Sequence, residues 1–181
     1  MKIELESMAI EMPEVEGHPN RVGFRGVLTL VDVLSDRPPS GSRGHRVVLT
    51  RSAAEAALPS LLGMALDYAP ELDRHDVRRK VGVITRAEIV GRALELGGYL
   101  YAKDFPEIVQ EIRRSRRAGE KWTGGSGLGM SYELAEARVA DLRANTWTLT
   151  QVTFTGAAVL RRTKAAYRDT WIELEEETVG V

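Results

Sequence analysis

Apolar and polar residues alternate along several stretches of this 181-residue chain, and this period of two predicts a β-rich protein. In residues 2–12, Ile3 and Leu5 alternate with charged residues. Residues 22–34 are strongly β-branched, and Gly23 and Gly26 within them suggest a bulge or a tight bend. Further strands are expected at residues 46–50, 81–85, 97–105, 128–138 and 146–159, with a short strand or turn at 87–94.

Helical patterns interrupt the strands at two or three places. Thr50 or Ser52 can cap a helix over residues 53–66, which Pro59 divides into two pieces. A second helix is expected over residues 106–121, with Pro106 in its first turn and basic residues near its end. Residues 161–170 can form a third helix.

Short strands in hairpin order favour an antiparallel architecture over repeated βαβ units. We therefore expect a mainly β protein with flanking helices (α+β), built as a closed or nearly closed antiparallel β-barrel of about seven strands. The length suits a single domain, which we assign to residues 1–170, followed by an acidic tail at residues 171–181.

Composition and charge exclude several function classes. Lys plus Arg total 25 and Asp plus Glu total 26, and this balance argues against a protein that coats nucleic acid or an anionic membrane. The chain has no cysteine, so a disulfide, a thiolate zinc site and a thiol nucleophile are excluded. The sequence has no apolar run of membrane-spanning length and no signal-peptide pattern at its start, so we expect a soluble, intracellular protein.

Any imidazole chemistry must use one of three histidines. His18 and His45 lie in loop-like segments, whereas His75 directly precedes an apolar strand and is the best candidate for a general base. A surface histidine among charges is the alternative for His75. Asp73 and Asp76 beside it do not have the spacing of a metal site, so we expect neither a metal nor another cofactor.

Ser126 and Ser131 are the candidate nucleophiles, in the glycine-rich stretch GGSGLGMSYEL. The stretch matches neither the G-x-S-x-G nucleophile elbow nor a dinucleotide-binding fingerprint. A hairpin loop that has a purely structural role is therefore the alternative interpretation. The basic run at residues 113–121 lacks interleaved aromatic residues and is typical of a solvated helix end.

Three segments in this order resemble one family. They are HDVRRKVGVITRAEI (residues 75–89), GLGMSYEL (127–134) and LTQVTFTGAAVL (149–160). Together, within a similarity that extends over residues 25–170, they resemble the prohead (capsid-maturation) serine proteases of tailed phages, which are related to herpesvirus assemblin. The resemblance implies a herpesvirus-protease-like fold.

The resemblance implies Ser131 as the nucleophile and His75 as the general base. The family usually has a glutamate in the third segment, where this chain has Gln151. A glutamine can orient an imidazole but cannot supply a carboxylate charge that stabilises imidazolium. The herpesvirus relatives use a second histidine instead, so the third group varies. Other options for this group are Thr153, Asp141 and Glu133.

The same resemblance implies that Arg161 and Arg162 help to form the oxyanion hole, with a basic helix start as the structural alternative. It further implies acyl transfer on capsid scaffold segments, and on the protease itself, inside the assembling procapsid in the host cytoplasm. A homo-oligomer, most simply a dimer, is expected from the family.

Two other functions stay open. One is a catalytically inactive assembly or scaffold-binding module of the same fold, which the presence of Gln151 favours. The other is a small β-rich binding domain whose glycine-rich loop contacts a ligand.

Overall fold

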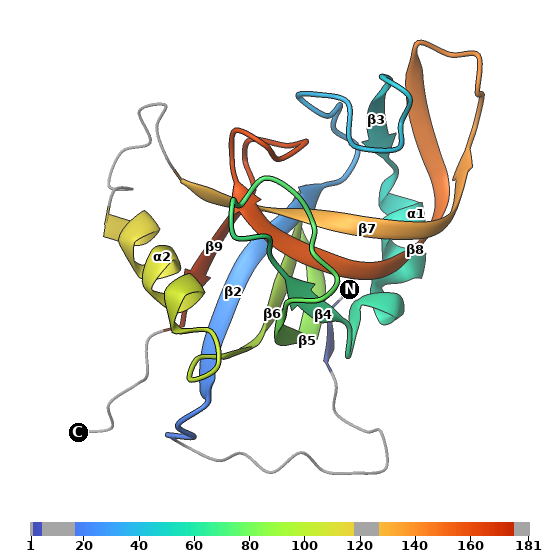
Figure 1. Ribbon diagram of the computed structural model, residues 1–181. Coiled ribbons are helices and arrows are strands. Elements are labelled where there is room, and N and C mark those ends of the chain that lie inside the picture. Colours follow the sequence, from blue (N-terminus) through green and yellow to red (C-terminus); the bar gives the residue numbers. More distant parts are fainter. Residues whose placement is uncertain (1, 5–16, 118–126, 176–181) are drawn as a thin grey trace.

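Nine strands form one curled sheet in the computed structural model, which describes residues 2–4, 17–117 and 127–175 (Figure 1). The strands are β1 (Lys2–Glu4), β2 (Arg21–Leu30), β3 (Arg46–Leu49), β4 (Ala65–Asp67), β5 (Lys80–Val90), β6 (Ala93–Tyr101), β7 (Leu128–Val139), β8 (Thr146–Arg161) and β9 (Trp171–Leu174). The helices are α1 (Arg51–Ala57), the 3₁₀-helix η1 (Leu58–Leu61) and α2 (Pro106–Arg117).

The sheet is a curled half-barrel, not the closed or nearly closed antiparallel barrel of about seven strands that the sequence predicted. Its strand order is β3-β8-β4-β5-β6-β2-β9, with β1 added to β5 and β7 added to β8. The end strands β3 and β9 do not pair with each other within the described residues, so the sheet curls into a half-barrel (Figure 1). Pairing is antiparallel except where β3 and β4 each run parallel to the long strand β8.

The predicted helix over residues 53–66 ends early. Helix α1 begins after Thr50, whose hydroxyl accepts a hydrogen bond from the backbone N–H of Ala53 (3.2 Å). Pro59 lies in the 3₁₀-helix that follows, and Gly63, with φ of +77°, turns the chain away from the helical path. Residues 65–67 then form strand β4, and this places Asp67 in the sheet.

Two expectations for the C-terminal part are also corrected. Residues 161–170 do not form a helix, because Arg161 is the last residue of β8 and residues 162–169 form turns and bends. Strand β9, which falls within the predicted acidic tail, pairs with β2 and is part of the sheet. Its sequence WIEL buries Ile172 and Leu174, while Glu173 forms an ion pair with Arg25 (2.6 Å), so alternation with a period of two explains the strand.

One face of the sheet carries the main hydrophobic core. Large side chains that are fully buried come from strands distant in sequence, including Phe24 of β2, Ile84 of β5 and Phe154 of β8. Helix α2 adds Ile108 and Ile112, because its apolar residues recur at helical spacing. The opposite face of β8 has a separate small cluster formed by Ala158, Leu160 and Ala165.

Truncating Phe154 tests this core. Phe154→Ala should destabilise the protein by about 3 to 5 kcal/mol, because the change leaves a cavity in the main core. Thr155→Ala is the matched control, since Thr155 is exposed and adjacent. Urea denaturation measures both variants, and equal midpoints would show that Phe154 is not a core residue.

Two buried tyrosines predict a loss of stability at alkaline pH. Burial raises the pKa of Tyr132, and raises that of Tyr167 to about 12. The folded state therefore favours the protonated phenol. The contribution of Tyr167 to the free energy of unfolding is complete below pH 10, the ordinary pKa of tyrosine, and is lost as the pH rises toward 12. For Tyr167 the expected loss is about 2 to 3 kcal/mol. Urea titrations at pH 8 to 11.5 should show this decline, and Tyr167→Phe should reduce it.

Candidate active site

Three neighbouring strands bring polar residues together on the sheet face opposite the main core. Asp67 of β4 pairs with Ala158 of β8, and Ala158 pairs in turn with Ser131 of β7. Paired residues in neighbouring strands point to the same face. Glu133 pairs with Gly156 and shares this face, whereas Tyr132 between Ser131 and Glu133 packs against the main core.

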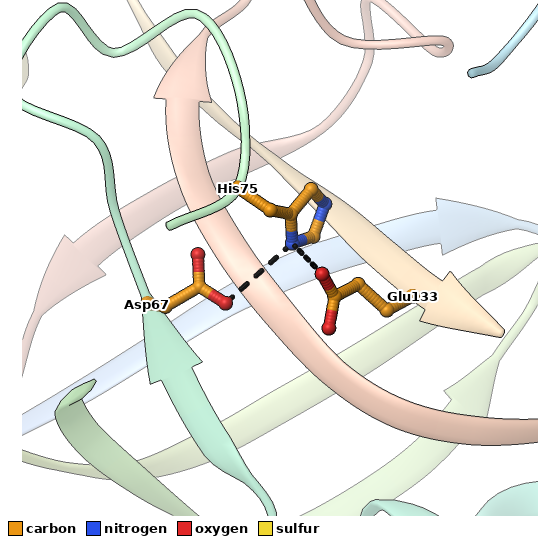
Figure 2. Close-up of side chains that lie close together, drawn as sticks. All are labelled: Asp67, His75 and Glu133. Atoms are coloured by element: carbon orange, nitrogen blue, oxygen red, sulfur yellow. Dashed lines mark ion pairs between the residues drawn. The ribbon is translucent and has the colours of Figure 1, made fainter. Parts of the chain in front are cut away.

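The segment between β4 and β5, residues 68–79, carries His75, whose ring lies beside Asp67 and Glu133 (Figure 2). Two hydrogen bonds fix the segment. The backbone N–H of Arg161 donates to the carbonyl oxygen of Leu72 (2.8 Å), and the backbone N–H of Asp76 donates to Oδ1 of Asp67 (3.0 Å). The residue next to His75 is therefore tied to the sheet, which limits where the imidazole can lie.

The imidazole of His75 lies between two carboxylates. Its Nδ1 is 3.3 Å from Oε1 of Glu133 and 3.6 Å from Oδ2 of Asp67. Figure 2 shows both carboxylates on the Nδ1 side of the ring, while Nε2 points away from them. Such a placement favours the tautomer with a proton on Nδ1 and leaves Nε2 free to accept a proton.

Burial strengthens the electrostatic interactions of Asp67 and His75. The Asp67 side chain is fully buried, and that of His75 is 21% exposed. Among the residues that the structure describes, Oδ2 of Asp67 has no hydrogen-bond partner, and Nζ of Lys80 lies 3.9 Å from it. A buried carboxylate without a close partner is costly, and a positive charge placed at Oδ2 would offset that cost.

Small residues of β8 leave room for this arrangement. Asp67 and Ser131 flank Ala158 across one strand on each side, so their backbones are about 10 Å apart. Gly156 has no side chain, and a Cβ added there would lie 3.4 Å from Oε2 of Glu133. Gly156 and Ala158 therefore leave space above β8, between β4 and β7. Larger side chains at these two positions would compete with the imidazole for that space.

Ser131 precedes Glu133 by two residues, about 7 Å along the same face of the strand. Its side chain is partly exposed, and its hydroxyl makes no hydrogen bond within the residues that the structure describes. The structure therefore brings Ser131 and His75 to one face of the sheet without a hydrogen bond between them.

The other candidates for the third group lie elsewhere. Gln151 is exposed and pairs with Arg138, toward the far end of the β7–β8 hairpin. The hydroxyl of Thr153 hydrogen-bonds Glu136 (3.3 Å). Asp141 is in the hairpin turn, where its carboxylate accepts a hydrogen bond from the backbone N–H of Arg143 (2.8 Å).

The two arginines occupy different environments. The backbone N–H of Arg161 donates to Leu72, and that of Arg162 donates to Gly127 (2.9 Å), so both amides are already used. The Arg161 side chain is exposed, whereas the Arg162 side chain packs over Gly127 and Gly129, on the same strand face as Ser131. Burial lowers the pKa of Arg162, and Asp169 opposes this shift.

The remaining candidates are outside this cluster. Ser126 lies outside the described residues. Nδ1 of His18 accepts a hydrogen bond from the backbone N–H of Asn20 (3.1 Å), and the ring of His45 stacks on that of Trp147 with centroids 4.6 Å apart.

Asp67 is the functional candidate that sequence analysis missed. One ligand atom each from Asp67, His75 and Glu133 lie within 4.8 Å of one another, so these three residues could also hold a metal ion. The local signal available was Gly63, which can end a helix before residue 65.

Comparisons with known proteins give little further information. No protein family and no curated protein matches the sequence. One similar solved structure is Kaposi's sarcoma herpesvirus protease in complex with an allosteric inhibitor, with 12% identity over 87% of this chain and 77% of that chain and a TM-score of 0.39. A likeness at this level assigns neither a family nor a function.

No helix among the described residues is long and apolar enough to span a membrane.

Proposed function

We propose that the protein is a serine endopeptidase in which Ser131 is the nucleophile and His75 the general base. The observation that carries this proposal is the position of His75, with Nδ1 facing Glu133 and Asp67 and with Nε2 free, over the face that includes Ser131. A nucleophile, a base and an acid that orients the base are the parts that acyl transfer by serine needs.

In this mechanism Oγ of Ser131 attacks a peptide carbonyl while Nε2 of His75 accepts the hydroxyl proton. The imidazolium that forms is stabilised by Glu133 and Asp67 at Nδ1, where two buried or half-buried carboxylates lie within 3.6 Å. Nε2 then returns the proton to the leaving amine, and water releases the acyl-enzyme. Substrate binding must shorten the distance between Oγ and Nε2, as catalytic hydrogen bonds often tighten only in the complex.

Of the two arginines, Arg162 is the better candidate for stabilising the oxyanion of the transition state. Its partly buried side chain packs over Gly129, which precedes Ser131 by two residues on the same strand face. A guanidinium there would stabilise the negative charge that develops on the carbonyl oxygen. Arg161 is exposed and its backbone N–H holds the 68–79 segment, so we assign it a positioning role.

The biological assignment rests on the resemblance of three sequence segments to prohead proteases. We propose on that basis that the substrates are capsid scaffold segments and the protease itself, cleaved inside a procapsid in the host cytoplasm, and that the active form is a homo-oligomer. The alternative of an inactive assembly module depended on Gln151 as the third group. Two carboxylates beside His75 remove that support.

A serine-directed phosphonate probe tests the proposal. Labelling should map by mass spectrometry to Ser131 and should disappear in His75→Ala, because the hydroxyl then lacks its base. His45→Ala is the matched control and should label normally, since His45 stacks on Trp147 outside the cluster. The proposal fails if Ser131 is unlabelled at every pH between 6 and 9.

A further inference from the structure

We propose that Asp67, His75 and Glu133 bind a divalent transition-metal ion, with Zn²⁺ the best match, and that the ion blocks the base function of His75. The second half of this inference rests on the proposed function, whereas the binding itself does not. The three residues converge from β4, from the 68–79 segment and from β7, as Figure 2 shows.

The first argument is an unsatisfied charge. Nδ1 of His75 carries at most one proton, but two carboxylates face it. Oδ2 of Asp67 is fully buried, and neither this oxygen nor Nδ1 has a hydrogen-bond partner within residues 2–4, 17–117 and 127–175. Lys80 is 3.9 Å from Oδ2 and its side chain is 43% exposed, so it compensates the charge only weakly. A divalent cation would neutralise both carboxylates and use both orphaned atoms.

The second argument is distance. Separations of 3.3 and 3.6 Å from Nδ1 to the two oxygens are longer than ordinary N–H···O hydrogen bonds. Ligand atoms bound about 2.1 Å from a tetrahedral zinc ion lie about 3.4 Å from one another. All three candidate ligand atoms are within 4.8 Å of one another, so a small contraction completes the site.

The donor set selects the class of metal. One imidazole nitrogen with two carboxylate oxygens suits zinc and similar ions, and a fourth position is left for water. Magnesium and calcium favour sites built from six or more oxygen ligands, including water. Asp67 is already oriented for this role, because the backbone N–H of Asp76 holds Oδ1 and leaves Oδ2 facing the imidazole.

Metal binding and catalysis should exclude each other. When a metal occupies Nδ1 of a neutral imidazole, the ring proton is on Nε2. Nε2 then donates a hydrogen bond and cannot accept the proton of Ser131. A metal at this position would therefore inactivate the proposed enzyme reversibly, and a chelator would restore it.

Zinc titration against a chromophoric chelator tests binding directly. We expect one Zn²⁺ per chain, and Co²⁺ substitution should give the visible absorption of a tetrahedral site. Glu133→Gln and His75→Asn should weaken binding by at least about 10-fold to 100-fold. The double variant His18→Ala/His45→Ala and the nucleophile variant Ser131→Ala retain all three ligands and should bind zinc as the unaltered protein does. Circular dichroism identifies any ligand variant that has not folded.

The results of these experiments test zinc binding and the block of His75 separately. The metal site is overturned if no stoichiometric binding occurs, or if folded Glu133→Gln and His75→Asn variants bind zinc normally. The block is overturned if bound zinc leaves phosphonate labelling of Ser131 unchanged. A protein that binds zinc through these residues but never reacts with the phosphonate would retain the metal site and refute the proposed peptidase.

Discussion

Ser131→Ala is expected to reduce peptide-bond cleavage by about a millionfold, to the level of His75→Ala, because nucleophile and base act as a unit. Combining the two changes should cost little more than either one alone. Turnover of a fluorogenic peptide, or disappearance of self-cleavage products on a gel, measures the loss. The exposed Thr155→Ala variant, on the neighbouring strand, serves as the control and should cleave normally.

A Ser131→Ala variant that cleaves at the wild-type rate would contradict this assignment. Ser126 would then be the next nucleophile to replace, because it is the other serine of the glycine-rich stretch.

Removing both carboxylates beside His75 should have the second largest effect. The double variant Asp67→Asn/Glu133→Gln keeps the side-chain shapes but removes the charge that stabilises imidazolium, so kcat should fall by about 10⁴-fold. Each single variant should fall less, about 10-fold to 100-fold, since one carboxylate then still faces Nδ1. KM should change little, because neither carboxylate needs to contact the substrate. Steady-state kinetics of the three variants gives these values.

Gln151→Ala is the matched test of the alternative third group. Gln151 is exposed and pairs with Arg138, so its removal should leave kcat within about twofold of the unaltered enzyme. A large loss in Gln151→Ala, together with normal activity in the double carboxylate variant, would contradict the assignment of Asp67 and Glu133.

Local sequence patterns predict much of this fold. Strand β8 follows from its β-branched residues, and α2 follows from apolar residues at helical spacing. The β5–β6 hairpin was predicted only in part, because residues 87–94, expected as a short strand or turn, extend β5 to Val90 and begin β6 at Ala93. The Thr50 cap and the break at Pro59 are also readable, because each depends on neighbours in the chain.

Local sequence patterns do not predict contacts between segments that are distant in the chain. Strand β4 has three residues and is stabilised by parallel pairing with β8, about 90 positions later. Apart from Gly63, its local sequence therefore does not distinguish it from the end of the preceding helix. The role of Asp67 was missed for this reason. Gln151 was favoured by the segment it occupies. The register of β7 against β8 instead pairs Glu133 of β7 with Gly156, five positions beyond Gln151 along β8, and this brings Glu133 to the imidazole.

The closed barrel was a wrong prediction for a related reason. Strand lengths and hairpin order are local, but closure requires the first and last strands of the sheet to meet. Here β9 pairs with β2 at one end and β3 pairs with β8 at the other, and these ends stay apart within the described chain.

A crystal structure of the phosphonate-treated protein would test the relation between Ser131 and His75 most directly. We expect phosphorus bonded to Oγ of Ser131, Nε2 of His75 within about 3.2 Å of a phosphonyl or seryl oxygen, and Nδ1 facing Glu133 and Asp67. An unmodified Ser131, or an imidazole that stays out of reach of the modified serine, would contradict the proposed catalytic centre.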